Sequence, residues 1–393
     1  MWKKRKFVLI LMSFLFTFPV FSQVSSHQKI SDLEGNFAGV LDDYDHFGTP
    51  CASIGDLDND GTEDLAVGAY YDSDGGYRRG AIWILFLNSD GTVKGFQKIS
   101  DTEGNFTGDL DDSDYFGFSC SAIGDLDGDG NTELAVGAIR DDDGGDRRGA
   151  VWILFLNPDG TVKTYQKISN TEGNFYGILD NRDAFGSYCC SPGDINGDTV
   201  PDLVVSEEND DDGGMNHGAI WILFLNSNGT VKSYEKISDN KAYFNGVLDD
   251  YDLFGASCSA INDLNGDSIP DLAVGASGDE DGGYHKGAVW ILFLNSDGTV
   301  QSYQKISDTA GNFDGELNDG DVFGRACAFV KDLNNDMIPD LAVSSVADDD
   351  GGENRGAVWI LYLNRDGTVK NHQKISDTSG NFHGVLDDND NFG

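Results

Sequence analysis

Short runs of apolar residues alternate with polar turns along the chain. In the unit 118–169, apolar runs occupy 118–123, 134–138, 150–157 and 162–169, and Asp and Gly dominate the stretches between them. The third run, AVWILFLN, is apolar on both faces and predicts a central strand, whereas the fourth alternates like an edge strand. Nothing in this unit has the 3.6-residue period of a helix. The pattern therefore predicts four short β-strands per unit.

The same unit recurs every 69 residues, so the chain is one repeat array rather than two or three separate domains. Three residue types mark the period. They are Phe47, Phe116, Phe185, Phe254, Phe323 and Phe392, each followed by Gly; Trp83, Trp152, Trp221, Trp290 and Trp359; and Cys51, Cys120, Cys189, Cys258 and Cys327. Four antiparallel strands per radially repeated unit are what a β-propeller requires. We predict an all-β propeller with five full four-stranded antiparallel blades and partial units at both ends.

The first residues predict export. Four cations at positions 3–6 precede an apolar run from Phe7 to Phe21 and small residues near a cleavage position, as in a secretory signal peptide. The alternative, a membrane anchor, needs about 20 apolar residues, which is more than this run offers. We expect a secreted or cell-surface protein whose mature chain does not insert into a membrane. The predicted segments are a signal peptide at 1–22, a partial repeat with an outer strand and an inter-blade loop at 23–48, and blades at 49–117, 118–186, 187–255, 256–324 and 325–393, the last with the start of a further repeat.

The two ends of the array carry nearly the same segment. HQKISDLEGNFAGVLDDYDHFG at 27–48 matches HQKISDTSGNFHGVLDDNDNFG at 372–393. The mature chain would therefore begin with an outer strand and end where another inner strand should start. We expect the sequence to be part of a longer protein. The alternative is a closed five-bladed ring with a spare strand.

The chain is strongly acidic. Its formal charge is −42, and removing the four cations of 3–6 leaves −46. The acids are clustered at fixed phases of the repeat rather than scattered, which favours multivalent cations as partners. Nucleic acid and anionic membrane surfaces are excluded as partners, because binding phosphates requires positive patches.

One acidic loop follows the first strand of each unit and begins at Asp56, Asp125, Asp194, Asp263 or Asp332. Positions 1, 3, 5 and 9 of each loop carry an oxygen side chain, and a tight loop turns alternate side chains toward one point. The predicted ligands are Asp56, Asp58, Asp60 and Asp64; Asp125, Asp127, Asp129 and Glu133; Asp194, Asn196, Asp198 and Asp202; Asp263, Asn265, Asp267 and Asp271; and Asp332, Asn334, Asp336 and Asp340. Hard oxygen ligands suit Ca²⁺, whereas Zn²⁺ prefers His or Cys. We predict up to five Ca²⁺ ions, one per blade; the alternative is a solvated acidic turn.

The acidic loops differ from an EF-hand, and they also differ among themselves. An EF-hand needs a bidentate glutamate at position 12, where this chain has a valine in every unit. The last three loops also depart from the first two. They carry Asn at position 3, and they replace the glycine after position 5 by Thr199, Ser268 and Met337. We expect a strained turn and weaker calcium binding in these three loops.

The repeat resembles a known family. The Phe-Gly pair, the acidic loop and the DLAVGA that follows it (Asp64–Ala69 and Asp271–Ala276) are similar to the FG-GAP repeat, the blade of integrin α-subunit propellers and of many bacterial surface proteins. The resemblance covers residues 27–393. It implies a β-propeller whose nine-residue loops bind calcium through positions 1, 3, 5 and 9.

The segments on the opposite face, such as 70–80 and 41–48, predict either a second cation site, a ligand-binding surface or a solvated loop pair. The tryptophans lie in apolar runs and are expected in the core, although exposed ones would stack on sugars. The cysteines are expected to be buried thiols of the innermost strands, with a vicinal disulfide between Cys189 and Cys190 as the alternative.

No constellation of catalytic residues stands out, because the histidines are scattered and the paired carboxylates all repeat. We expect a non-catalytic adhesion or protein-interaction module that binds a protein or glycan ligand on one propeller face. The alternatives are a carbohydrate-binding propeller and a structural repeat array of a larger cell-surface protein.

Overall fold

The computed structural model describes residues 27–239 and 241–393, and the predicted signal peptide at 1–22 lies outside them. The described chain forms five four-stranded antiparallel sheets whose strands pair in chain order. The strands are β1 (Cys51–Gly55), β2 (Asp64–Ala69), β3 (Ala81–Leu87), β4 (Val93–Ser100), β5 (Phe116–Gly124), β6 (Glu133–Ala138), β7 (Ala150–Leu156), β8 (Val162–Ile168), β9 (Cys189–Gly193), β10 (Asp202–Glu207), β11 (Ala219–Leu225), β12 (Val231–Ile237), β13 (Phe254–Ala260), β14 (Leu272–Ala276), β15 (Ala288–Leu294), β16 (Val300–Ile306), β17 (Phe323–Val330), β18 (Asp340–Ser345), β19 (Ala357–Leu363) and β20 (Val369–Ser376).

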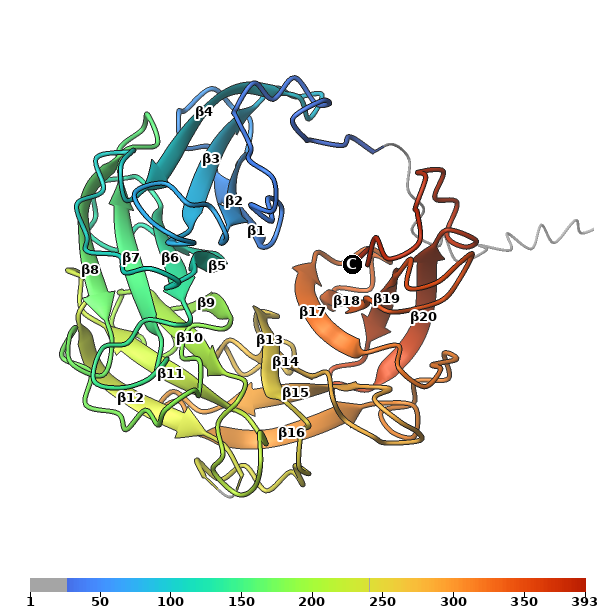
Figure 1. Cartoon of the computed structure of the whole chain (residues 1–393). Coiled ribbons are helices and arrows are strands. Elements are labelled where there is room, and N and C mark those ends of the chain that lie inside the picture. Colours follow the sequence, from blue (N-terminus) through green and yellow to red (C-terminus); the bar gives the residue numbers. More distant parts are fainter. Residues whose placement is uncertain (1–26, 240) are drawn as a thin grey trace, which may run out of the picture.

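The sheets fan around a common axis as the blades of a β-propeller (Figure 1). The first strand of each blade lies nearest the axis and the fourth lies outermost. This confirms the predicted all-β propeller of five blades. Within residues 27–239 and 241–393, no helix is long and apolar enough to cross a membrane.

The arc of blades is open between the first and the fifth (Figure 1). The closed ring that the sequence left as an alternative is therefore absent from this structure. Residues 27–48 form turns and irregular backbone instead of the predicted outer strand. Each outer strand pairs with the third strand of its own blade, as β4 does with β3, and the segment 27–48 has no such partner. It runs toward the fifth blade, where the ring of His27 lies 5.8 Å from that of Phe382.

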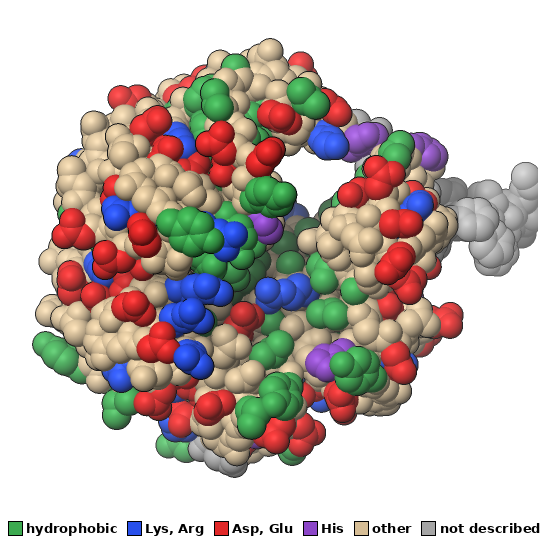
Figure 2. Space-filling view, viewed as in Figure 1, with side chains coloured by type: hydrophobic (Ala, Val, Ile, Leu, Met, Phe, Trp, Pro, Cys, Tyr) green, Lys and Arg blue, Asp and Glu red, His purple; other side chains and the backbone are tan. Residues whose placement is uncertain are grey.

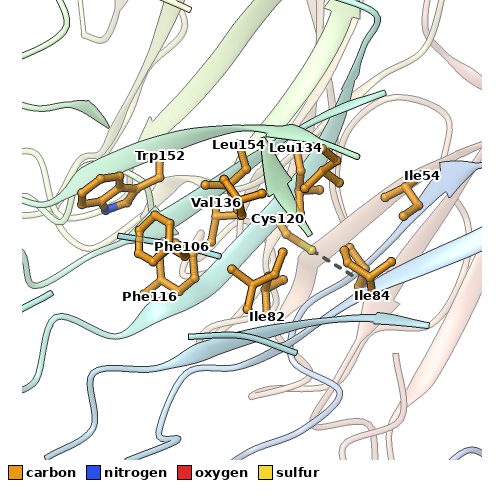
Figure 3. Packing of buried hydrophobic residues seen from close by; sticks show 14 of the residues in the cluster. Ile54, Ile82, Ile84, Phe106, Phe116, Cys120, Leu134, Val136, Trp152 and Leu154 are labelled. Atoms are coloured by element: carbon orange, nitrogen blue, oxygen red, sulfur yellow. Dashed lines mark hydrogen bonds between the residues drawn. The ribbon is translucent and has the colours of Figure 1, made fainter. Parts of the chain in front are cut away.

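The hydrophobic core lies between neighbouring blades. Ile82 and Ile84 of the first blade pack against Cys120 and Val136 of the second (Figure 3). At the same junction, Phe116 of the Phe-Gly pair is fully buried. The central strands are apolar on both faces because the second, third and fourth blades are each covered by a neighbouring blade on both sides; the first and fifth blades border the open side of the arc.

An aromatic set joins each inter-blade linker to the blade that follows it. Phe106 stacks on Phe116 at 5.2 Å and meets Trp152 edge-on at 5.2 Å (Figure 3). Such pairs are worth about 0.5–1.5 kcal/mol each beyond their buried area. Equivalent sets are Phe37, Phe47 and Trp83; Phe175, Phe185 and Trp221; Phe244, Phe254 and Trp290; and Phe313, Phe323 and Trp359. The five tryptophans are 3–4% exposed, which confirms that they belong to the core.

The glycine of the Phe-Gly pair allows the blades to approach closely. Gly117 has φ +86°, and a Cβ there would lie 2.3 Å from the carbonyl oxygen of Ala81 in the preceding blade. No side chain fits such a gap, so any substitution would separate the two blades.

All six cysteines are free thiols, and five of them are buried as predicted. Cys51 is the exception, because β1 borders the open side of the arc and its side chain is exposed. The vicinal disulfide between Cys189 and Cys190 does not form in this structure.

Candidate functional site

The acidic loops join the first and second strands of each blade, and their first aspartate folds the loop around itself. In the second blade, the Asp125 carboxylate accepts hydrogen bonds from the backbone N–H groups of Gly128 (2.7 Å) and Gly130 (2.9 Å). The corresponding aspartates that accept such bonds are Asp56, Asp194, Asp263 and Asp332. The loop shape is therefore encoded by position 1.

The acid at position 9 ties the loop to the sheet. Asp64 is fully buried and accepts hydrogen bonds from Leu57 N (3.1 Å) within the loop and from Leu87 N (3.0 Å) at the end of β3. Asp202 and Asp271 bind backbone groups in the same way. A carboxylate oxygen has a second lone pair, so these bonds leave position 9 able to face an ion.

In the first two loops, three of the four predicted ligands converge, and the acids at position 5, Asp60 and Asp129, are not in these groups. Carboxylate oxygens of Asp56, Asp58 and Asp64 lie within 4.8 Å of one another, and those of Asp125, Asp127 and Glu133 do the same. Asp58 Oδ1 and Glu133 Oε1 are buried without a hydrogen-bond partner. A buried oxygen without a donor is costly, and a bound dication would remove that cost. The residues at positions 1, 3 and 9 therefore fit a calcium ion.

The last three loops place fewer charges at the same point. Asn196 and Asn265 direct their side-chain oxygens to backbone N–H groups of the loop, at 3.0 Å and 2.8 Å. In the fifth loop, Asn334 Oδ1 and Asp340 Oδ1 are buried without partners. The residue after position 5 is in the left-handed region in these loops, with φ +72° at Thr199, +73° at Ser268 and +66° at Met337. The first two loops have glycine there, so the expected strain is present in the last three.

Burial perturbs the acids at position 9. It raises the pKa of Glu133, Asp202 and Asp271 to about 7 and that of Asp340 to about 6, and it raises the pKa of Asp64 as well. The cause is desolvation of the charged form, reinforced by the neighbouring loop carboxylates. A cation at the loop centre would oppose both effects.

The acid at position 5 faces a lysine that the sequence reasoning missed. Lys163 at the start of β8 lies 2.9 Å from Asp127 and also contacts Asp129. Its hydrogen bond lowers the pKa of Asp129. The equivalent contacts are Lys94 with Asp58 and Asp60, Lys232 with Asp198, and Lys370 with Asp336. The fourth blade has Gln301 instead, 3.4 Å from Asp267. The sequence carries a signal for this lysine, because Val-Lys follows the Gly-Thr of the turn between the third and fourth strands in every blade except the fourth.

The opposite face carries a second set of acids, and each blade supplies its own cation for them. In the first blade, Lys98 Nζ lies 2.6 Å from Asp72 and 2.6 Å from Asp74, over the ring of Trp83 at 5.3 Å. The same cage encloses Lys167 with Asp141 and Asp143, Lys236 with Asp210 and Asp212, Lys305 with Asp279 and Asp281, and Lys374 with Asp348 and Asp350. A lysine ammonium thus stands where the sequence suggested a second cation site.

These loops also meet the following inter-blade linkers, as the strand directions predict. Tyr77 N donates to Asp112 Oδ1 (3.0 Å), and Ser113 N donates to Tyr77 O (2.8 Å). The linker aspartate next to each cage is buried, which raises the pKa of Asp114 and Asp252 to about 7.

The third blade adds one buried acid to this cage. Glu207 is 0% exposed, accepts a hydrogen bond from Trp221 Nε1 (2.6 Å) and lies 3.3 Å from Lys236. Its carboxylate lies within 4.8 Å of those of Asp183 and Asp210. Burial raises the pKa of Glu207 to about 8. The equivalent positions carry Ala69, Ala138, Ala276 and Ser345.

Five blades that each carry an acidic loop between the first and second strands define a propeller built from repeats. The comparisons with known proteins also indicate a repeat propeller. A family model described as the FG-GAP repeat matches residues 52–85, 120–154 and 254–292, within the first, second and fourth blades. The first, second and fourth blades therefore carry matches to the FG-GAP repeat, and the propeller is similar to those of integrin alpha subunits.

Similar curated proteins include both integrins and an enzyme. Integrin alpha-PS2 of Drosophila melanogaster is 31% identical over 172 residues, which are 42% of this chain and 12% of that protein. Integrin alpha-2 of Mus musculus is 26% identical over 242 residues, covering 61% and 18%. Phosphatidylinositol-glycan-specific phospholipase D of Bos taurus is 30% identical over 178 residues, covering 43% and 19%. The matched segments thus span less than a fifth of each relative's own length.

Proposed function

We propose that this protein is an exported, calcium-stabilised propeller that serves as a non-catalytic adhesion or protein-interaction module. The observation that carries the proposal is the convergence of Asp125, Asp127 and Glu133, with a buried Glu133 oxygen that lacks a donor. In the first loop Asp56, Asp58 and Asp64 converge likewise, and the buried oxygen without a donor belongs to Asp58. An ion at these points would link the first strand, the second strand and the end of the third strand of a blade.

The similarity to integrin alpha subunits supports an adhesion or interaction role and an extracellular location. The signal-peptide pattern at 1–22 supports export independently. The acidic loops between the first and second strands recur from blade to blade, which favours a structural role over catalysis; the buried acids Asp183, Glu207 and Asp210 of the third blade are a cluster that does not recur. The five tryptophans of residues 27–393 are buried and offer no face for sugar stacking, which favours a protein ligand over a glycan.

The expected effect on stability follows from mass action. Extracellular calcium modules have Kd values of roughly 10⁻⁴ to 10⁻³ M. At millimolar calcium each site would then add about 0.4–1.4 kcal/mol to the free energy of unfolding. Occupation of several sites should raise the melting temperature by several degrees relative to a chelator-treated sample.

Asp125→Asn removes one loop charge and should lower the calcium stoichiometry measured by isothermal titration calorimetry by one. Asp109→Asn is the matched control, because Asp109 is exposed in a linker and should leave the stoichiometry unchanged. A wild-type melting temperature that is the same in calcium and in chelator would reject the proposal.

A further inference from the structure

Aromatic residues that do not repeat gather at the junction of the first two blades. Tyr70 lies 4.6 Å from Tyr71 and 5.0 Å from Phe118, and Tyr71 lies 4.9 Å from Tyr115, measured between ring centroids. His46 joins the group at 4.5 Å from Tyr71. In the third, fourth and fifth blades, the positions equivalent to Tyr70, Tyr71, Tyr115 and Phe118 carry no aromatic residue. This departure from the repeat is local, so it marks a property of this junction alone.

Two arginines lie on these rings. The guanidinium of Arg78 is 4.1 Å from the centre of the Tyr71 ring, and that of Arg140 is 4.2 Å from the centre of the Tyr115 ring. Neither guanidinium has a carboxylate within 4.0 Å in the described part of the chain. This is unusual in a protein with 68 acidic and 26 basic residues, where arginines such as Arg79 and Arg355 are held by two carboxylates each.

The cluster lies on the face opposite the calcium loops. Tyr70 and Tyr71 follow β2, Arg140 follows β6, and Tyr115 precedes β5, so all four belong to the ends of inner strands near the axis. In Figure 2, Lys and Arg side chains border the central opening, whereas acids dominate elsewhere on the visible face. On the visible face, the border of the central opening is therefore where an anion would be attracted.

We propose that Arg78 and Arg140, held on Tyr71 and Tyr115, bind carboxylates of an acidic peptide segment on a partner protein. A guanidinium presents a planar fork of N–H donors that matches a carboxylate, and stacking on tyrosine fixes its orientation. The inference deepens the proposed interaction function by naming the partner's chemistry, and it rests on that function.

A peptide is favoured over an acidic sugar because the ring faces are already used. Arg78 lies over Tyr71, Arg140 lies over Tyr115, and Tyr115 is only 4% exposed, so these two rings offer a sugar less free surface than the two guanidinium groups offer a carboxylate. The overall negative charge of the protein repels anions at long range. Any acidic peptide that binds at physiological salt, where the Debye length is about 8 Å, must therefore do so through a local site.

The test uses a fluorescein-labelled peptide of alternating Glu and Gly and measures fluorescence anisotropy with the full chain. The double variant Arg78→Gln/Arg140→Gln should weaken binding at least about tenfold, since charge-assisted bidentate pairs are lost. The control is Arg147→Gln/Arg182→Gln, which removes the same charge from two exposed arginines that lie beside Asp146. The control should change binding less than twofold.

Equal weakening by both double variants would overturn the proposal, since it would mean that only diffuse charge matters. Tighter binding of a carboxylated glycan than of the peptide would also overturn it. The calcium-dependent melting shift separates the two proposals. If the shift persists without peptide binding, this inference fails alone, and if peptide binding persists without the shift, the calcium proposal fails alone.

Discussion

Glu207 offers a test of how burial controls the stability of the third blade. Its pKa of about 8 in the folded chain lies far above the ordinary glutamate value of about 4.3. The folded chain therefore holds a proton that the unfolded chain has already released. The resulting stabilisation is complete below the unfolded pKa and is lost as the pH rises toward 8. Each pH unit within this window removes about 1.4 kcal/mol from the free energy of unfolding.

The variant Glu207→Gln keeps an acceptor for Trp221 Nε1 and cannot ionise. Between pH 5 and pH 7.5 the wild type should lose about 3 kcal/mol more stability than this variant. Urea unfolding followed by tryptophan fluorescence, in chelator at each pH, measures the difference. Glu208→Gln is the matched control, because its side chain is partly exposed and pairs with Arg325 at 3.0 Å. Parallel stability curves for the wild type and Glu207→Gln would refute the reasoning.

Two further predictions concern the calcium loops. Lys163→Gln should tighten calcium binding about fivefold, because it removes a positive charge beside Asp127. Gln301→Lys should weaken calcium binding in the fourth blade by a similar factor. Calorimetry in which the calcium affinities of the two variants do not change in opposite directions would contradict this reasoning. Gly130→Ala should lower the free energy of unfolding by about 1 kcal/mol. Gly130 has φ +92° and open space around it, so the cost of the added methyl group is conformational alone. An unchanged midpoint of urea unfolding would be incompatible with this prediction.

The fold was predictable because the same pattern of apolar and polar residues occurs in five successive repeats. The alternation in 162–169 and the doubly apolar run 150–157 correspond to β8 and β7, which lie at an edge and within a sheet. The acidic loops were also predictable, since the acid at position 1 folds the loop through local backbone hydrogen bonds; the bond from position 9 to the end of the third strand, as from Leu87 N to Asp64, required the fold. The predicted calcium ligands themselves remain a prediction.

Pairings between distant strands and loops were not predictable from local pattern. Lys98 meets Asp72 and Asp74 only because the fourth strand folds back over the sheet. The exposure of Cys51 depends on the open arc, which the internal period of the sequence does not describe. Glu207 was visible as a single departure from alanine, but its burial against Trp221 required the fold.

Because of the lysine cages, the two faces of the propeller depend on different sources of positive charge. On one face, Lys98 and its four counterparts neutralise the acids, whereas on the other face a lysine reaches the acidic loop in four blades and, under the calcium proposal, the rest of the positive charge would come from bound ions. A fall in external calcium would consequently destabilise the face that carries the acidic loops, while the face that carries Arg78 and Arg140 would keep its structure. Ligand binding on one face and dependence on metal at the other would then be separable properties of the same arc of blades.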